Sequence, residues 1–294
     1  MKTLSFTKMQ GAGNDFVMLN GISQSIRPTP ELIRFLADRR FGIGADQVLM
    51  VERSQRGDTD FRYRIFNCDG GEVEQCGNGA RCFAVFVREE GLTDRRRIRV
   101  ETMKAVIEPM VTEDGRVTVD MGVPKFEPQD LPFVPDGLKS EKQGLSDVYR
   151  APDECGGVAF STASMGNPHA VIVVDSVDDA PVDTVGPAME HCSAFPARVN
   201  VGFLEAVSRT QARLRVWERG AGETLACGTG SCAAVVEGIR RGYFDSEVTL
   251  EARGGTLTIR WDGLKDSHAR VYLTGPAVTV FRGTITLPEY LTHD

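Results

Sequence analysis

No long hydrophobic run interrupts this sequence of 294 residues. Nothing in it approaches the roughly 18 consecutive apolar residues of a membrane-spanning helix, so we expect no membrane partner. The first residues, MKTLSFTKMQGAGNDF, also lack the continuous apolar segment that is typical of a secretory signal. The sequence therefore predicts a globular protein that works in the cytoplasm.

Positive charge is scarce relative to negative charge. The 34 Lys and Arg residues are outnumbered by 41 Asp and Glu, which gives a formal net charge of −7. Because non-specific affinity for nucleic acid comes from cations that neutralise phosphates, this balance argues against a nucleic-acid partner. We interpret the basic run at 95–97, with Arg99, as a solvated turn that enters a strand.

Cysteines are few, and their spacing follows no disulfide framework. There are seven, an odd number, at positions 68, 76, 82, 155, 192, 227 and 232. A chain of this size does not need disulfides to fold, so we expect reduced thiols. The spacings within the pairs 76/82 and 227/232 do not match zinc sites, and no Gly-Lys-Ser/Thr follows either glycine run, so neither zinc nor a P-loop is predicted.

What the chain does contain is an internal repeat. The phrase Cys-Gly-x-Gly occurs at 76–79 and again at 227–230, and each copy opens an apolar run of small residues. The matched landmarks are Asn14 with Asn167, Gln47 with Asn200, Asn67 with Glu218 and Cys76 with Cys227. The first two pairs are 153 positions apart (167 − 14, 200 − 47) and the last two 151 (218 − 67, 227 − 76). Four landmarks in one order indicate a duplicated domain, because this offset far exceeds the periods of repeat arrays.

The repeat and the length together predict two domains. We expect residues 1–124 to form an N-terminal domain that the C-terminal segment 275–294 completes, and residues 125–274 to form the second. Four prolines within twelve positions predict an extended linker between the copies. They are Pro124, Pro128, Pro132 and Pro135. Residues 136–160 carry little interpretable signal.

Segments rich in Val, Ile, Thr and aromatic residues predict more strand than helix. The strand candidates are 61–66, 98–101, 117–121, 170–174, 212–217, 248–252, 257–261 and 270–273, with a hairpin turn at Gly254-Gly255. One helix is predicted from its N-cap Thr29 to Arg40, with Pro30 at the first helical position, and a counterpart lies near 187–191.

The runs at 80–87 and 231–236 are apolar on nearly every face, so a helix formed by either must be buried all round. We therefore predict an α/β fold (α+β mixed) of two pseudo-symmetric domains. Each is a curled, barrel-like mixed β-sheet around a central helix, with the active site in the cleft between the domains.

A thiol at the start of each central helix suggests the chemistry. The positive end of the helix dipole and the unpaired N–H groups there favour thiolate over thiol. Glycines at 77, 79, 228 and 230 let an oxygen approach the backbone, which makes each helix start an anion cradle. A single cysteine of this kind is more typical of a small buried hydrophobe, but the repeat favours two thiols that flank the α-carbon of one carboxylate.

At this point the sequence resembles a known family. Its motifs are QGAGNDF (10–16), GIGADQ (42–47), FNCDGG (66–71), CGNGARC (76–82), GNPH (166–169), RVNV (198–201) and ERGAGET (218–224) with ACGTG (226–230). From about residue 4 to 283 they resemble diaminopimelate epimerase. The resemblance implies that LL- and meso-diaminopimelate are interconverted without pyridoxal phosphate, metal or other cofactor, for lysine or peptidoglycan precursors.

The resemblance also implies roles for individual residues. Cys76 and Cys227 exchange the α-proton on opposite faces of the carbon, and His169 and Glu218 tune the pKa values of the two thiols. The other residues implied in substrate binding are Asn14, Gln47, Asn67, Gly77, Asn78, Asn167, Asn200, Arg219, Gly228 and Thr229, together with Glu218. Amides at 77–78 and 228–229 stabilise the developing charge. The remaining cysteines, at 68, 82, 155, 192 and 232, are interpreted as packing residues.

A homodimer is implied as well, although Phe281 stands near the place where relatives commonly have a Tyr that supports the dimer contact. Two other functions remain open. A proline or hydroxyproline racemase would not need Asn167, Asn200 and Arg219 for a second amino-acid end. A thiol-based redox sensor or small-ligand binding protein would explain the helix-start thiols but not the duplicated polar residues.

Overall fold

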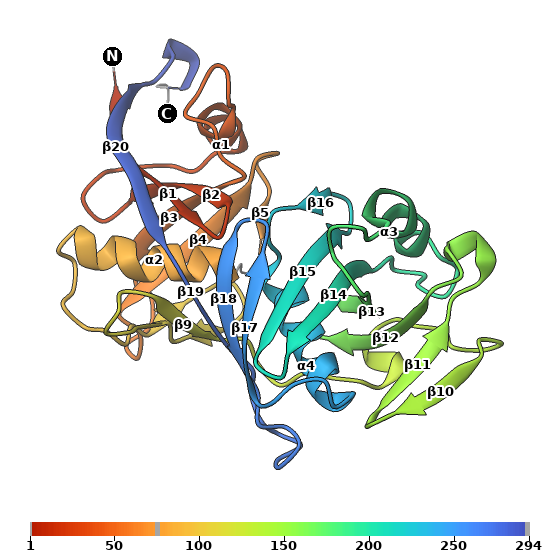
Figure 1. The fold of residues 1–294 in the computed structure, drawn as a ribbon. Helices are drawn as coiled ribbons and strands as arrows, with labels where there is room; N and C mark the ends of the chain where they lie inside the picture. The colour runs from red at the N-terminus through yellow and green to blue at the C-terminus, as the bar shows by residue number, and fades with distance from the viewer. Residues whose placement is uncertain (1, 74–76, 292–294) are drawn as a thin grey trace. The chain divides into compact units, whose positions relative to one another are not determined.

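The computed structural model describes residues 2–73 and 77–291 and divides into two compact units. The first unit comprises Met1–Val119 and Gly275–Asp294, and the second comprises Asp120–Thr274. Each is a mixed sheet with helices, and in each one long helix lies against the sheet (Figure 1).

The first unit is built on a sheet with the strand order β20-β1-β2-β3-β4-β6-β7, and β5 pairs with β4. Its strands are β1 (Thr3–Gly11), β2 (Asn14–Asn20), β3 (Gln47–Arg53), β4 (Phe61–Asn67), β5 (Glu72–Val73), β6 (Val100–Glu101), β7 (Val106–Ile107) and β20 (Val278–Thr286). The pairs β2–β3 and β4–β6 are parallel. A further hairpin is formed by β8 (Met110–Val111) and β9 (Val117–Asp120), and η3 (Glu289–Leu291) follows β20.

Helix α2 (Gly77–Glu89) is the core of the first unit. It packs against β1, β2, β3 and β20, and Cys82, Phe83, Ala84 and Val87 have no exposed surface. The prediction of a helix buried all round is confirmed. Helix α1 (Pro30–Ala37) also begins as predicted, because the Thr29 hydroxyl accepts the Leu32 N–H at 3.3 Å.

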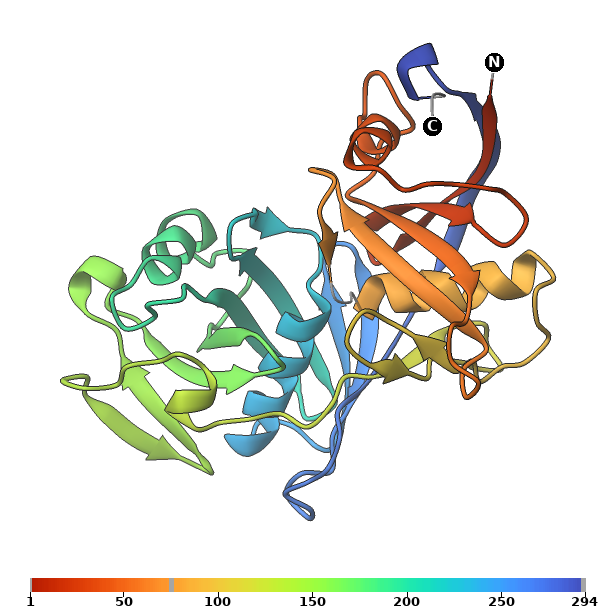
Figure 2. The ribbon, with the colours of Figure 1, turned by 180° about the vertical axis from the view of Figure 1, so that it is seen from behind.

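The second unit repeats this plan, with the strand order β10-β11-β12-β13-β14-β15-β17-β18-β19 and β16 beside β15. Its strands are β10 (Ser140–Gln143), β11 (Ser146–Arg150), β12 (Ala159–Ser164), β13 (Pro168–Val173), β14 (Asn200–Ser208), β15 (Gln211–Glu218), β16 (Gly222–Thr224), β17 (Glu247–Ala252), β18 (Gly255–Arg260) and β19 (Tyr272–Gly275). Its helices are η1 (Pro128–Asp130), η2 (Asp153–Cys155), α3 (Val182–Glu190) and α4 (Gly228–Arg240). Helix α4 packs against β12–β15, β17 and β18 as the central helix, and Figure 2 shows it from behind.

The strand registers confirm the duplication. Phe16 pairs with Gln47 across the parallel strands β2 and β3, and His169 pairs with Asn200 across β13 and β14, 153 positions later. Antiparallel β3–β4 and β14–β15 also correspond, since Val48 pairs with Phe66 and Val201 with Trp217. From Val48 to Phe66 there are 18 positions (66 − 48), and from Val201 to Trp217 there are 16 (217 − 201), which accounts for the change of offset from 153 to 151.

The proline-rich segment is only partly the extended linker that its composition predicts. Leu131 and Phe133 are buried in the core of the second unit, where the Phe133 ring stacks on Phe195 with ring centroids 4.9 Å apart. The segment after it, which gave little signal, forms the hairpin of β10 and β11. Prolines fix backbone angles, but they do not prevent the apolar side chains between them from packing.

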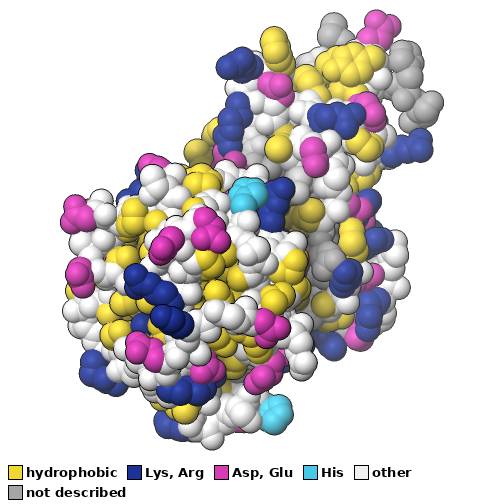
Figure 3. All heavy atoms as spheres, turned by 90° about the vertical axis from the view of Figure 1, so that its right-hand side faces the viewer, with side chains coloured by type: hydrophobic (Ala, Val, Ile, Leu, Met, Phe, Trp, Pro, Cys, Tyr) yellow, Lys and Arg dark blue, Asp and Glu magenta, His cyan; other side chains and the backbone are white. Residues whose placement is uncertain are grey.

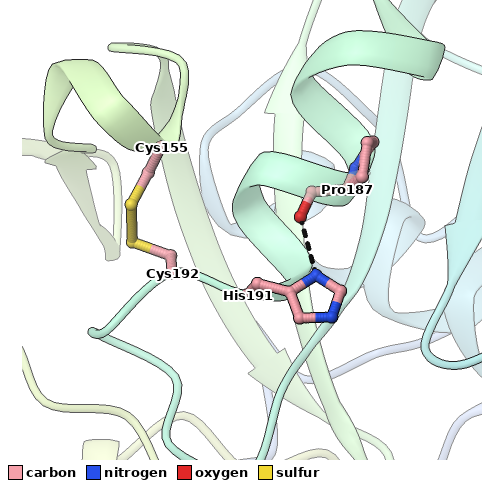
Figure 4. Close-up of a disulfide and its surroundings, with 4 residues drawn as sticks. All are labelled: Cys155, Pro187, His191 and Cys192. Carbon is pink, nitrogen blue, oxygen red and sulfur yellow. Dashed lines mark hydrogen bonds between the residues drawn. A yellow bond between two sulfur atoms is a disulfide. The ribbon is translucent and has the colours of Figure 1, made fainter.

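The prediction that all cysteines are reduced is wrong for two of them. Cys155, at the end of η2, and Cys192, two residues after α3, form a disulfide (Figure 4). Cys68 is exposed, so its interpretation as a packing residue is wrong as well. Cys82 and Cys232 are fully buried on α2 and α4, which confirms their packing role.

The surface carries charges of both signs. On the face drawn in Figure 3, acidic and basic side chains are interspersed rather than gathered by sign. Among the described residues, no helix is long and apolar enough to cross a membrane.

Candidate active site

Cys227 is the N-cap of α4. Its backbone is extended (φ −121°, ψ 115°), and its Sγ accepts the N–H of Gly230 at 3.4 Å, in the place where a capping oxygen usually lies. A Cβ at position 230 would come within 3.3 Å of this sulfur, so glycine leaves the room that the thiol needs. The thiol therefore lies at the helix start that the sequence predicts, with an exposed fraction of only 7%.

A chain of hydrogen bonds connects this thiol to His169. The Thr229 hydroxyl lies 3.5 Å from Cys227 Sγ and accepts a hydrogen bond from Asn167 Nδ2 at 3.2 Å. Asn167 Oδ1 in turn lies 3.0 Å from His169 Nε2. Because Asn167 already donates to the hydroxyl, the hydroxyl hydrogen is available to the sulfur. Thr229 and the Gly230 amide can thus both stabilise a thiolate once it forms.

The surroundings of Cys227 favour the thiol over the thiolate. Burial raises the pKa of Cys227 well above its usual range, and the negative charge of Glu218 raises it further. The hydrogen bonds from Thr229 and Gly230 oppose this change but do not outweigh it. The helix start by itself favours a thiolate, but here the cost of burying a charge exceeds the effect of the dipole.

His169 is neutral. Its side chain is 1% exposed, and burial, together with the positive charge of Arg219, lowers the pKa of His169 from 6.5 to about 3. An uncharged imidazole that donates from Nε2 orients the Asn167 amide without adding a charge beside the sulfur. Its connection to Cys227 therefore runs through Asn167 and Thr229.

Glu218 is the last residue of β15, and Arg219 begins the turn that follows. The Thr224 hydroxyl donates to Glu218, and Asn200 Oδ1 accepts the backbone N–H of Arg219 at 3.0 Å. Asn200 also donates to the carbonyl of Pro168 at 3.0 Å, which fixes the orientation of its amide. The Arg219 guanidinium donates to the Ala197 carbonyl at 2.9 Å, so part of its fork remains for a ligand.

The first unit brings together its own set of predicted residues. Asn78, on the first turn of α2, donates to Asn14 Oδ1 at 3.4 Å, and Gln47 donates to Asn67 Oδ1 at 2.9 Å across β3 and β4. Gly77 is the first residue of α2. Cys76, the partner thiol in the sequence repeat, lies outside the described residues.

Sequence reasoning missed a cluster of charges that supports Asn14. Asp46 accepts the Asn14 side-chain amide at 3.0 Å, and Arg39 joins Asp46 to Asp15. Burial alone would raise the pKa of Asp15, but hydrogen bonds from Arg39 and Lys8 outweigh burial and hold that pKa well below its usual range. Asp15 and Asp46 stand inside the QGAGNDF and GIGADQ motifs, which is the signal that could have identified them.

Possible metal ligands can be examined only in the part of the chain that the structure describes. Within 2–73 and 77–291, no three His, Cys, Asp or Glu side chains are arranged to hold a metal ion. In the second unit the structure places a buried thiol, oriented amides and the backbone N–H groups at the start of α4, with one carboxylate next to one guanidinium in the sequence.

Two units, each a curled mixed sheet around a buried helix, define a two-domain α/β fold that other solved proteins share. A phenazine biosynthesis protein of the PhzF family from Bacillus anthracis has a TM-score of 0.67 at 18% identity, with 98% of this chain and 100% of that one covered. A hydroxyproline epimerase from Agrobacterium vitis has a TM-score of 0.65 at 16% identity, with 96% and 92% covered. At such identities the likeness concerns the fold.

Sequence relatives identify the family within this fold. The family model for diaminopimelate epimerase matches residues 6–127 and 161–280. Diaminopimelate epimerases from Laribacter hongkongensis and Burkholderia thailandensis are 61% and 56% identical to the chain, and each match covers 97% of this chain and 99% of the relative. The chain belongs to the diaminopimelate epimerase family.

Proposed function

We propose that Cys76 and Cys227 are the acid–base pair of this enzyme, an isomerase that converts LL-diaminopimelate into meso-diaminopimelate in lysine biosynthesis. The observation that supports the assignment of Cys227 is its position: a buried thiol at a helix start, with the Thr229 hydroxyl and the Gly230 amide beside its sulfur. Cys76 is assigned from the sequence repeat.

The raised pKa of Cys227 assigns its role in the resting enzyme. A thiol that burial keeps protonated is ready to donate, so Cys227 delivers a proton to the α-carbon while Cys76, as thiolate, removes the proton from the opposite face. After the transfer Cys227 is a thiolate, which Thr229 and Gly230 stabilise. The α-carbon loses one proton and gains one, so the transfer step balances, and the two residues exchange roles when the reaction runs in reverse. Before the next forward turnover Cys227 regains a proton and Cys76 loses one, by exchange with water.

The carbanion needs stabilisation without an external electron sink. We assign this task to the backbone amides at 77–78 and 228–229, which lie at the first turns of α2 and α4. Such donors, aimed at the substrate carboxylate, are strongest where negative charge develops in the transition state.

Selectivity comes from the distal end of the substrate. Arg219 suits the distal carboxylate because its planar fork pairs with both oxygens, and Glu218 suits the distal ammonium. The amides that read the same end are those of Asn67, Asn167 and Asn200, while Asn14 and Gln47 line the site. An amino acid with one carboxylate leaves these groups unpaired, which disfavours proline as a substrate.

Deuterium incorporation tests the proposed function directly. LL-diaminopimelate incubated in deuterated water with the reduced enzyme and no added cofactor is expected to gain α-deuterium while its stereochemistry equilibrates. Turnover of proline or hydroxyproline in place of diaminopimelate would support the racemase alternative. Folded, reduced enzyme that leaves LL-diaminopimelate fully protonated would support the redox sensor.

We infer that the enzyme acts as a homodimer in the cytoplasm. Strand β20 ends the strand order of its sheet, and Val278, Val280 and Phe281 expose about half of their surface on it. An apolar edge strand of this kind is suited to pairing with a second copy. Sedimentation of the wild type as a dimer, and of the V280E/F281E variant as a monomer, would support this assembly, whereas a monomeric wild type would contradict it.

A further inference from the structure

Glu190 is a carboxylate in an unfavourable place. It is the last residue of α3, where the negative end of the helix dipole repels an anion, and it is only 3% exposed. Burying a charge is costly unless the charge is paired and hydrogen-bonded. The local rules for helices therefore do not explain this residue, and its partners must.

The two oxygens of Glu190 hold the end of β15 and the turn that follows it. Oε1 accepts the backbone N–H of Gly220 at 2.9 Å, and Oε2 accepts the indole Nε1–H of Trp217 at 2.8 Å. The guanidinium of Arg198 lies 3.5 Å from Oε1 and balances the charge. The two hydrogen-bonded residues flank Glu218 and Arg219 in the sequence.

Two further features bring the end of α3 to this position and keep it there. A Cβ at Gly186 would lie 2.7 Å from Trp217 Cγ, so glycine lets the indole pack directly on the helix. Beyond the helix, His191 Nδ1 lies 3.0 Å from the Pro187 carbonyl, and the next residue, Cys192, is tied to Cys155 (Figure 4). Glu190 is thus presented from a helix end that is anchored on both sides.

We propose that Glu190 is a positioning residue for substrate selectivity, which acts by fixing the Glu218–Gly220 turn. The inference rests on the proposed function, because that function assigns the distal end of the substrate to Glu218 and Arg219. Asn200 and the Ala197 carbonyl hold the same turn from other directions, at 3.0 Å and 2.9 Å. Glu190 is the charged member of this set, and it acts through the turn without touching the substrate.

A comparison of two substrates distinguishes a positioning role of Glu190 from a general structural role. 2-Aminopimelate has the same carbon chain as diaminopimelate and the distal carboxylate, but it lacks the distal ammonium that Glu218 is proposed to bind. We measure kcat and KM for α-deuterium incorporation into both compounds with the full-length wild type, E190Q and E205Q. Glu205 is a matched control, because it also accepts a backbone N–H (Val177, 2.9 Å) and an arginine (Arg213, 3.1 Å) but does not hold the turn.

E190Q is expected to lower kcat/KM for diaminopimelate roughly tenfold, mainly through KM, since it weakens two hydrogen bonds to a charged acceptor. The loss for 2-aminopimelate is expected to stay below roughly threefold, because one distal contact is already missing. E205Q should change kcat/KM for either substrate by no more than about twofold. Equal losses of E190Q on both substrates, or a loss confined to kcat, would overturn the inference.

A second variant decides the matter if E190Q does not fold. W217F keeps the ring against Gly186 but removes the indole donor, so it should shift selectivity in the same direction by a smaller factor. Unchanged selectivity in W217F would then overturn the inference. Failure of the proposed function is separable, since it would appear in the wild type as a lack of α-deuterium incorporation into diaminopimelate.

Discussion

In both units the hairpin that precedes the buried helix is held together by an Arg–Glu pair. Arg64 makes two hydrogen bonds to Glu72, at 2.8 and 2.6 Å, and Arg215 makes two to Glu223, at 2.7 and 3.0 Å. The second pair stands 151 positions after the first (215 − 64, 223 − 72), the offset of the two cysteines. The scaffold that leads to the thiol has therefore been kept in both copies.

The surroundings of the two hairpins differ in charge. Where the first unit has Asn67, the second has Glu218, and Arg219 follows it. Glu223 also accepts a second arginine, Arg253, at 3.0 Å, whereas Glu72 pairs with Arg64. The two copies therefore share a frame but differ in charge, because Glu218 and Arg219 stand where the first copy has Asn67 and Cys68.

Removing either thiol is the most severe test of this comparison. C227A and C76A are each expected to lower kcat by about 10²–10⁴-fold, because each removes one of two required acid–base groups. Steady-state assays of LL-diaminopimelate epimerisation measure the loss, and circular dichroism checks the fold. Substantial turnover by either variant would contradict the two-thiol mechanism, while similar losses in both would show that the copies contribute equally.

Removing the disulfide tests a feature that the second unit has and that the described part of the first lacks. The C155S/C192S variant is expected to lose about 2–4 kcal/mol of unfolding free energy, since the bridge closes a loop across 37 positions. Both tryptophans, Trp217 and Trp261, lie in the second unit, so their fluorescence in urea reports on that unit. An unchanged midpoint would show that the bridge does not stabilise it.

Replacing the glutamates of the Arg64–Glu72 and Arg215–Glu223 pairs sharpens the comparison further. E223Q is expected to lower the unfolding free energy by about 2 kcal/mol and E72Q by about 1 kcal/mol. The difference follows from the second arginine on Glu223 and from its smaller side-chain exposure, 12% against 24%. Urea melts followed by circular dichroism measure both. Equal losses, or a larger loss in E72Q, would contradict the asymmetry.

The smallest expected effect concerns His169, whose register counterpart in the first unit is Phe16. A pKa of about 3 in the folded protein, against 6.5 unfolded, means that the unfolded chain binds more protons between these values. Stability from this group is therefore complete well above pH 6.5 and is lost as pH falls toward 3; between pH 7 and pH 6 the loss stays below about 1 kcal/mol. Urea melts at pH 7 and pH 6 should show a smaller decline in H169Q than in the wild type; equal declines would contradict the assignment.

Local rules predicted the elements that local chemistry determines. Thr29 and Pro30 fixed the start of α1, and the Cys-Gly-x-Gly phrase marked the start of α4 with Cys227 as its cap. The residues at 248–261 indicated the β17–β18 hairpin, although its turn is formed by Arg253 and Gly254, one residue earlier than predicted, and Gly255 already belongs to β18. The all-round apolar runs predicted two buried helices, because a helix without a polar face requires cover on every side.

The features that the sequence did not predict depend on contacts between residues that are distant in sequence. Leu131 and Phe133 pack because Phe195 and its neighbours are there to receive them, and Cys155 meets Cys192 because of the path taken by α3. Spacing alone does not determine either contact. The strands 140–143 and 146–150 have too few apolar residues for a clear alternating pattern.

The residues of the candidate site also divide into those that the sequence predicted and those that depend on distant contacts. Sequence motifs predicted Asn167, Asn200 and Glu218, whose side chains are found in one hydrogen-bonded neighbourhood of the second unit. They did not predict Glu190, because a glutamate at the end of an amphipathic helix usually lies in solvent. Nor did they predict the protonation of Cys227, because burial depends on the whole unit and outweighs the dipole that the sequence reveals.

The pairing of β1 with β20 has a consequence for the order in which the molecule is made. Leu4 pairs with Ile285, so β1, the first strand to be synthesised, cannot complete its pairing until β20, the last strand, has been synthesised. At roughly 5–20 residues per second, this wait is on the order of tens of seconds. The second unit, residues 120–274, is complete before the first unit can close. At that stage residues 120–274 can fold while the edge of β1 that pairs with β20 is still accessible to chaperones.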